Sequence, residues 1–206
     1  QHPAAYHVDA VQATGKIPIH PEELGIDFLT ASAHKFHGPK GIGFLYASSM
    51  DFDSYLHGGD QEQKKRAGTE NLAAIVGMVA ALKEDLEKQE EHFQHVQNLE
   101  TAFLAELEGI QYYLNIGEHH LSYVLNIGFP GQKNDLLLLR LDLAGISIST
   151  GSACTAGIVQ SSHVLEAMYG ANSERLKESV RISLSPQNTV EDLQTLAKTL
   201  KEIIGG

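Results

Sequence analysis

Three short apolar runs separated by turn residues occupy the first fifty residues of the chain. The runs are residues 5–8, 25–31 and 42–47, and Pro18 and Pro21 interrupt the connection between the first two. Short apolar runs bounded by Gly and Pro are typical of strands. We therefore expect a buried sheet in this part of the chain, with helices covering its faces.

A helical pattern begins near residue 70 or 71 and stops at Gly109. Apolar residues recur at intervals typical of a helix in its first part: Leu72, Ile75, Val76, Val79, Ala80 and Leu82. Residues 83–95 are rich in Glu, Lys, Gln and His, and we interpret them as a solvated helix face or as a bend joining two domains. His92 and His95 are expected to be solvated there.

The rest of the chain alternates predicted strands and helices. Strands are expected at residues 112–114, 123–127, 146–148 and 179–184, and helices at 134–144 and 189–204. Thr189 and Asp192 stand three residues apart, close to a capping box at the start of the last helix. Together the patterns predict two domains, residues 1–88 and residues 89–206.

Composition narrows the class of protein. The 206 residues carry a formal net charge of −11, and the sequence pI is about 5.4, which argues against nucleic acid or an anionic membrane surface as a partner. The single cysteine excludes an internal disulfide and fits a reducing compartment. No apolar run approaches the length of a membrane span. These features fit a cytoplasmic enzyme.

Residues 32–41 carry the densest chemical signal, Ser-Ala-His-Lys-Phe-His-Gly-Pro-Lys-Gly. Lys35 follows a predicted strand and precedes a Gly-Pro turn, so a cleft could hold its amine rigidly. A lysine amine forms a Schiff base with an aldehyde when burial or nearby cations lower its pKa. The alternative is a loop with surface lysines, which suits Lys40 better.

Asp9 stands at the end of a predicted strand about two dozen residues before Lys35. Asp9 could bind a cofactor that contains a pyridine ring. The nitrogen of such a ring needs an anionic partner to stay protonated, and an Asp in that role makes the ring an electron sink. Gln12, one turn further on, could donate a hydrogen bond to the ring oxygen. Taken alone, Asp9 would more often be a helix N-cap.

Gly68 and Thr69 precede the long helical pattern. A helix N-terminus with free N–H groups and a hydroxyl can bind an anion, and simple N-capping by Thr69 is an equal alternative.

Cys154 lies among small polar residues, 149–157. A loop of this kind can carry a thiol to and from a site. An isolated cysteine is more usually buried, but the flanking Ser, Thr and Gly favour an exposed thiol here. Arg181 is the one cation within a predicted apolar strand. It requires a carboxylate, either from a ligand or from an internal salt bridge.

Eleven histidines raise the hypothesis of a metal site. His34 and His37 are three residues apart, as are His92 and His95, but neither pair has a third and fourth ligand nearby in the sequence. We expect no metal.

Four segments resemble a known family. They are His-Val-Asp-Ala-Val-Gln at residues 7–12, Ser-Ala-His-Lys-Phe-His-Gly-Pro-Lys-Gly-Ile-Gly at 32–43, Arg-Ala-Gly-Thr at 66–69 and Gly-Ser-Ala-Cys at 151–154. They look like segments of the class V aminotransferase-type enzymes, specifically the NifS/IscS-like cysteine desulfurases. The resemblance covers essentially the whole chain and implies an α/β fold: part of the large-domain sheet of the fold type I pyridoxal-phosphate enzymes, and a smaller C-terminal α+β domain carrying the cysteine loop.

The resemblance also implies roles for eight residues. Catalysis would fall to Lys35 and Cys154, binding of pyridoxal 5'-phosphate to Asp9, Gln12, Ser32, His34, Lys35 and Thr69, and binding of the substrate carboxylate to Arg181. The implied reaction takes sulfur from L-cysteine, leaving L-alanine and a persulfide on Cys154. A sulfur-acceptor protein of iron–sulfur cluster assembly or tRNA thiolation would receive it, and the enzyme would be a homodimer.

Other functions remain open at this level. A selenocysteine lyase or another class V aminotransferase-type enzyme would share these segments, and an isolated piece could serve as a non-catalytic interaction module. The sequence begins shortly before Asp9, so the family's earlier cofactor-binding residues cannot be assigned. We therefore expect the 206 residues alone to be inactive.

Overall fold

The computed structural model describes residues 4–117, 119–151 and 162–205. The chain forms two compact units, residues 1–92 and residues 93–206. Within these described residues, each unit contains one three-stranded sheet. None of the helices in the described ranges is long and apolar enough to cross a membrane.

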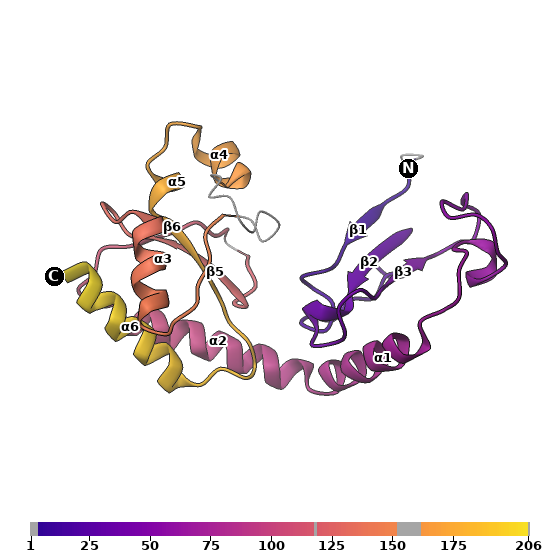
Figure 1. Cartoon of the computed structure of the whole chain (residues 1–206), viewed down its shortest axis with the longest axis horizontal. Helices are drawn as coiled ribbons and strands as arrows, with labels where there is room; N and C mark the ends of the chain where they lie inside the picture. The colour runs from indigo at the N-terminus through magenta and orange to yellow at the C-terminus, as the bar shows by residue number, and fades with distance from the viewer. Residues whose placement is uncertain (1–3, 118, 152–161, 206) are drawn as a thin grey trace. The chain divides into compact units, whose positions relative to one another are not determined.

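The sheet of the first unit has the order β1-β2-β3 (Figure 1). β1 (His7–Asp9) pairs with β2 (Phe28–Ser32) in parallel, and β2 pairs with β3 (Gly43–Ala47) in antiparallel. These strands correspond to the three apolar runs of the sequence, with bounds that differ by at most three residues. Two short 3₁₀ helices follow strands: η1 (Ala33–Lys35) comes directly after β2, and η2 (Glu62–Lys64) lies beyond β3.

Two helices replace the single long helical pattern. α1 (Leu72–Glu87) and α2 (Gln89–Glu106) are separated at Lys88, within the polar stretch. This break agrees with a bend in that stretch. Asn71 caps α1, because its side chain accepts a hydrogen bond from the Ala74 amide at 3.2 Å. Thr69 therefore does not cap this helix.

The second unit is built on an antiparallel sheet of order β4-β5-β6. The strands are β4 (Tyr113–Leu114), β5 (Val124–Gly128) and β6 (Ser179–Ser183). Its further helices are α3 (Asn134–Leu143), α4 (His163–Tyr169), α5 (Arg175–Glu178) and α6 (Val190–Gly205). The expected strand at residues 146–148 is absent. At that place the described chain forms a single bridge, between Ser149 and Arg181.

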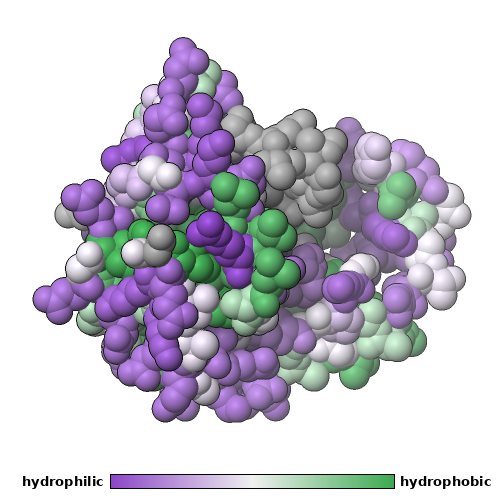
Figure 2. Space-filling view, turned by 60° about the vertical axis from the view of Figure 1, so that its left-hand side comes forward, coloured by the Kyte–Doolittle hydropathy of each residue, from purple (hydrophilic) through white to green (hydrophobic). Residues whose placement is uncertain are grey.

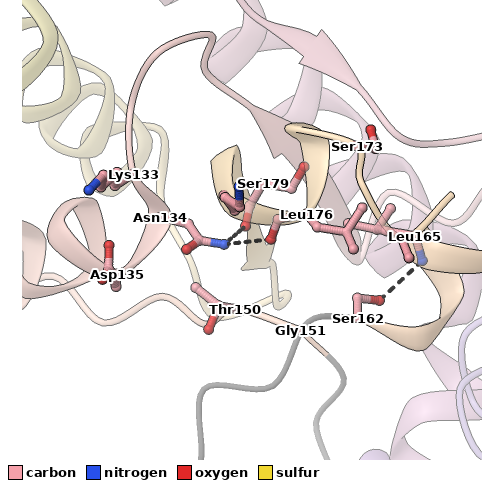
Figure 3. A pocket seen from close by; sticks show the side chains of 12 residues that line it. Lys133, Asn134, Asp135, Thr150, Gly151, Ser162, Leu165, Ser173, Leu176 and Ser179 are labelled. Carbon is pink, nitrogen blue, oxygen red and sulfur yellow. Dashed lines mark hydrogen bonds between the residues drawn. The ribbon is translucent and has the colours of Figure 1, made fainter. Parts of the chain in front are cut away.

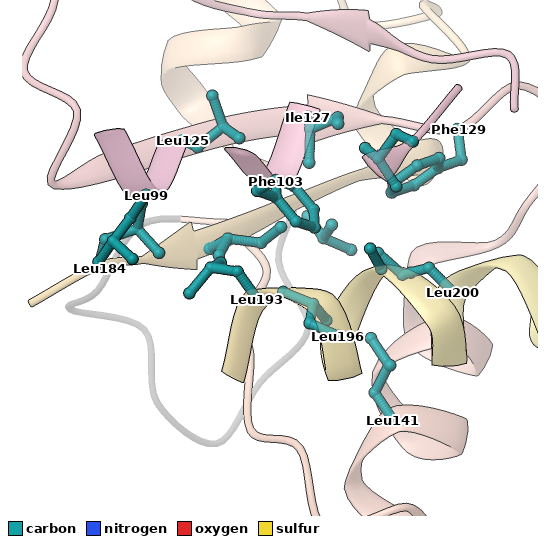
Figure 4. Packing of buried hydrophobic residues seen from close by; sticks show 14 of the residues in the cluster. Leu99, Phe103, Leu125, Ile127, Phe129, Leu141, Leu184, Leu193, Leu196 and Leu200 are labelled. Carbon is teal, nitrogen blue, oxygen red and sulfur yellow. The ribbon is translucent and has the colours of Figure 1, made fainter. Parts of the chain in front are cut away.

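One apolar core holds the second unit together (Figure 4). Alternate residues of β5 and β6 face it, among them Leu125, Ile127 and Ile182, each at most 4% exposed. Leucines and a phenylalanine from the helices close the core: Leu99, Phe103, Leu141, Leu193, Leu196 and Leu200. The expected capping box at the start of α6 is confirmed, since Thr189 Oγ1 accepts from the Asp192 amide and Asp192 Oδ2 from the Thr189 amide.

The first unit has only small apolar clusters among its described residues. One joins Phe36 of the turn after η1 to Met78 of α1, and another lies under β1 and β2 around Leu29. Several large apolar residues of α1 are more than half exposed: Leu72, Val76, Val79 and Leu86. Apolar surface, green in Figure 2, is visible among paler and hydrophilic residues at the lower right of that view.

Candidate active site

The carboxyl ends of β1 and β2 bring two predicted site segments to one edge of the first sheet. The strands are parallel, with Asp9 paired to Thr30, so their carboxyl ends point the same way. Asp9 is the last residue of β1, and Lys35 ends the 3₁₀ helix that follows β2 directly. In open α/β sheets, ligands bind outside the carboxyl ends of parallel strands. Asp9 and Lys35 therefore belong to an edge suited to a ligand.

Asp9 and Gln12 are both exposed. Asp9 Oδ1 accepts a hydrogen bond from the Val11 amide at 3.0 Å, which orients the carboxylate at the strand end. Gln12 Oε1 accepts from Lys16 Nζ at 3.0 Å. An oriented, exposed carboxylate can still accept a hydrogen bond from a protonated ring nitrogen.

Lys35 projects from a tightly held turn. The amides of Phe36 and Gly38 both donate to the Ala33 carbonyl, at 3.0 and 2.8 Å, and both Ala33 and Phe36 are buried. A Cβ on Gly38 would lie 2.9 Å from that of Ala33, so the turn requires glycine there. Lys35 is half-buried, whereas Lys40 is exposed. The distinction between the two lysines made from the sequence agrees with this difference.

His37 has a left-handed backbone, with φ of 64°. Such a φ is uncommon for a non-glycine residue and requires support from its surroundings. The support comes from Asp85 of α1, whose Oδ1 lies 3.6 Å from His37 Nδ1 and 3.7 Å from Nδ1 of His92.

Asp85 is only 7% exposed. Burial raises the pKa of the Asp85 carboxyl, and the charges of His37 and His92 oppose that shift. Burial also lowers the pKa of Lys16, and the nearby charge of Lys35 lowers it further, while Asp85 acts in the opposite direction. Lys16 and Asp85 are thus neighbours of the lysine turn that sequence reasoning missed, because neither stands in a motif.

The two histidines of the polar stretch are half-buried, whereas the sequence led us to expect them to be solvated. His92 contacts Asp85, and Nε2 of His95 lies 2.9 Å from the Asn188 carbonyl oxygen. Helical spacing shows which face of a helix is polar, but it does not show which polar residues another segment covers.

The remaining cofactor candidates lie on the first unit as well. Ser32 is half-buried at the end of β2, His34 is exposed in η1, and Thr69 is exposed in the segment before α1. Within the described residues, no hydrogen bond engages the side chains of these three. Their polar atoms can therefore receive a ligand.

Arg181 lies on β6 of the second unit, on the face opposite the core, because its neighbours Val180 and Ile182 are buried. Its Nε donates to Ser149 Oγ at 3.0 Å. No carboxylate of the described chain lies within 4.0 Å of its guanidinium. An internal salt bridge therefore does not account for this arginine in the described part of the unit.

A pocket of about 450 Å³ lies beside α3, α4 and α5 (Figure 3). Gly151 and Ser162 both line it. Asn134 braces one wall by donating to the carbonyls of Leu176 and Ser179, each at 3.1 Å. Cys154 lies outside the described residues, between Gly151 and Ser162 in the sequence.

Comparison with known proteins identifies the family. The family described as aminotransferase class-V matches residues 1–196. The chain belongs to the class V aminotransferase family, whose members depend on pyridoxal phosphate, and its fold is that of the fold type I enzymes.

The relatives of this chain include proteins named as cysteine desulfurases. It is 46% identical to a putative cysteine desulfurase IscS 1 of Bacillus subtilis, over 99% of this chain and 55% of that protein. It is 39% identical to a cysteine desulfurase IscS of Dictyoglomus turgidum, over 97% of this chain and 51% of that protein.

Solved structures agree with these relatives. A NifS-like protein superposes with a TM-score of 0.86 at 34% identity, over 98% of this chain and 52% of the other. A NifS-like protein from Rickettsia africae gives 0.85 at 31% identity, over 98% and 54%. The chain spans about half the length of the relatives it matches.

Proposed function

We propose that this chain supplies the lysine and the sulfur-accepting cysteine of a pyridoxal-phosphate-dependent cysteine desulfurase. The observation that carries the proposal is the meeting of Asp9 and the Lys35 turn at one edge of the first sheet, in a chain 46% identical to a protein named as a cysteine desulfurase. Residues 1–88 would form the cofactor-binding part and residues 89–206 the domain that carries the cysteine.

The residues at the sheet edge fit pyridoxal phosphate. Asp9 would hold the ring nitrogen protonated, and Gln12 would contact the ring oxygen. Ser32 and His34 would bind the phosphate of the cofactor in their own subunit. In a homodimer, Thr69 would contact the phosphate of the cofactor that the partner subunit holds. When bound, the cofactor supplies an electron sink for the bond changes at the amino acid.

Lys35 would hold the cofactor covalently and then move the proton of the substrate α-carbon. A half-buried amine on a rigid turn suits both tasks, because its position does not depend on a flexible loop. Lys16, which is half-buried, adds positive charge near Lys35.

Arg181 would bind the α-carboxylate of L-cysteine, and Cys154 would take the sulfur as a persulfide while L-alanine is released. The fit of Arg181 rests on its position outside the core, away from any carboxylate of the described chain. The persulfide would pass to an acceptor protein of iron–sulfur cluster assembly or tRNA thiolation, in the cytoplasm.

The test uses the full-length protein and two lysine variants. Lys35→Ala is expected to abolish alanine production from cysteine, whereas Lys40→Ala, an exposed lysine five residues away, is expected to keep it. Circular dichroism of both variants controls for folding. Alanine production by Lys35→Ala at the wild-type rate would exclude the proposed role of this lysine.

A second variant separates binding from sulfur transfer. Cys154→Ala should still bind cysteine, seen as a change in the visible absorbance of the bound cofactor, but should form no persulfide. If this variant transfers sulfur to an acceptor as the wild type does, Cys154 is not the acceptor.

A further inference from the structure

Ser149 and Arg181 are joined by a backbone bridge at the edge of the second sheet. The Ser149 amide donates to the Arg181 carbonyl at 3.1 Å, and the Arg181 amide donates to the Ser149 carbonyl at 2.6 Å. This antiparallel pairing continues the sheet by one residue beyond β6. It places the two side chains next to each other on the same face.

The side chains of this pair also bond to each other. Arg181 Nε donates to Ser149 Oγ at 3.0 Å, and the Ser149 hydroxyl is 3.4 Å from the Arg181 carbonyl oxygen, to which it donates. With its proton directed to that carbonyl, the hydroxyl oxygen presents lone pairs to Nε. The bond therefore fixes one edge of the guanidinium.

The face that carries this pair is polar along its width. Asn126 of β5 stands opposite Arg181 in the sheet register, and its Oδ1 accepts from Asn115 Nδ2 at 2.8 Å. The side-chain oxygen of Asn126 thus already has a hydrogen-bond partner in Asn115. Ser149 is the residue of this row whose side chain bonds to the guanidinium of Arg181.

A guanidinium can bind a carboxylate in two bidentate ways, through Nε and one terminal nitrogen or through both terminal nitrogens. Because Ser149 occupies Nε, the second way is the one left. We propose that Ser149 is a positioning residue, which turns Arg181 so that its two terminal nitrogens receive the carboxylate of the amino-acid substrate. The proposal rests on the carboxylate role of Arg181 under the proposed function.

The test compares three variants of the full-length protein. Ser149→Ala removes the hydroxyl but keeps the backbone bridge, and Ser149→Thr restores a hydroxyl. Ser183→Ala is the matched control, because Ser183 lies two residues from Arg181 on β6, is exposed, and forms no side-chain bond with it.

The first measurement is made on the protein without substrate. The Arg181 Nε–H resonance, assigned by its loss in Arg181→Lys, should be protected from exchange with solvent in the wild type, Ser149→Thr and Ser183→Ala. In Ser149→Ala it should shift, and its exchange should speed up about tenfold or more. An unchanged resonance and exchange rate in Ser149→Ala would overturn the proposal.

The second measurement separates KM from kcat. Ser149→Ala should raise KM for L-cysteine about tenfold with little change in kcat, the order expected when one charge-assisted contact is misaligned. Binding of 2-aminoethanethiol, which has the amine and thiol without the carboxylate, should not change. Loss of Nε–H protection without a change in KM would show that the bond does not position Arg181 for substrate, and would also overturn the proposal.

Failure of the proposed function has a different signature. A full-length wild type that does not turn over cysteine refutes the desulfurase assignment, and with it the substrate carboxylate that the positioning role requires. The Nε–H measurement still shows in that case whether Ser149 holds Arg181.

Discussion

The two units of the chain bury their apolar residues to different extents. The second unit has one continuous core that draws on α2, α3, α6 and all three strands of its sheet. Among its described residues, the first unit has two small clusters, with Phe36 and Met78 in one and Leu29 in the other, and it leaves large apolar residues of α1 exposed. All six candidate cofactor-binding residues nevertheless lie on the first unit.

This difference shows that stability and chemistry are distributed unequally along the chain. Burial of apolar surface is the main favourable contribution to folding, so the second unit has the larger source of stability. Some of the buried residues of the first unit are polar, among them Asp85. A lysine turn held by a buried carboxylate gives a defined site, but it adds little hydrophobic stabilisation.

The largest expected effect concerns the units as separate proteins. Residues 93–206 alone should unfold in one cooperative thermal transition, because their core is complete within the unit. Residues 1–92 alone should show no such transition. Far- and near-ultraviolet circular dichroism against temperature measures both, and a sharp transition in residues 1–92 would contradict the comparison.

A core substitution should affect the second unit strongly. Phe103→Ala removes a fully buried ring of α2 and should lower the free energy of unfolding by about 3–5 kcal/mol. Leu143→Ala on α3, where the leucine is 80% exposed, is the control and should change it by about 0.5 kcal/mol or less. Denaturant unfolding of residues 93–206 provides the measurement, and equal effects would show that the core is not where the structure places it.

A pH effect is expected at the buried carboxylate of the first unit. The pKa of Asp85 is raised from its ordinary value of 3.8 by burial, so the folded state binds this proton more tightly than the unfolded state. Its contribution to stability is present below the unfolded pKa and is lost as the pH rises through the raised, folded pKa. His37, His92, Lys16 and Glu84 are the titratable groups around the Asp85 carboxyl.

Asp85→Asn should remove this pH dependence. From pH 3.5 upward, roughly spanning the range in which Asp85 ionises, the wild type should lose stability relative to the variant. Amide hydrogen exchange in α1 of the full-length protein, measured as a function of pH, reports this difference in stability. Glu90→Gln, an exposed change on α2, should leave the profile as it is, and parallel profiles for wild type and Asp85→Asn would contradict the burial argument.

The smallest expected effect is at the cap of α1. Asn71→Ala removes the side chain that accepts from the Ala74 amide and should destabilise α1 by about 1 kcal/mol. Asn71→Asp keeps an acceptor and should restore most of the loss. Hydrogen exchange of the first turn of α1 measures the difference, whereas Thr69→Ala should not change it. A similar loss of stability in Thr69→Ala would show that Thr69, and not Asn71, is the N-cap of α1.

Much of the element order could be predicted from hydrophobic spacing. The strands around Leu29 and Leu125 and the capping box at Thr189 were predictable because their signals are local. The expected strand at residues 146–148 was wrong, because apolar spacing cannot tell a strand from a segment that touches the sheet at one residue. His92 and His95, expected to be solvated, are half-buried because each contacts a polar group that folding brings to it.

The sequence by itself determined the family and the chemical segments, since motifs such as residues 32–43 are contiguous in the chain. Only the tertiary structure brought Asp9 and the Lys35 turn to one sheet edge, placed Asp85 beneath His37, and paired Ser149 with Arg181. Ser149 and Arg181 are 32 residues apart in sequence. The physical reason is that motifs encode local side-chain chemistry, whereas strand pairing and burial depend on contacts between residues far apart in the chain, which no local pattern records.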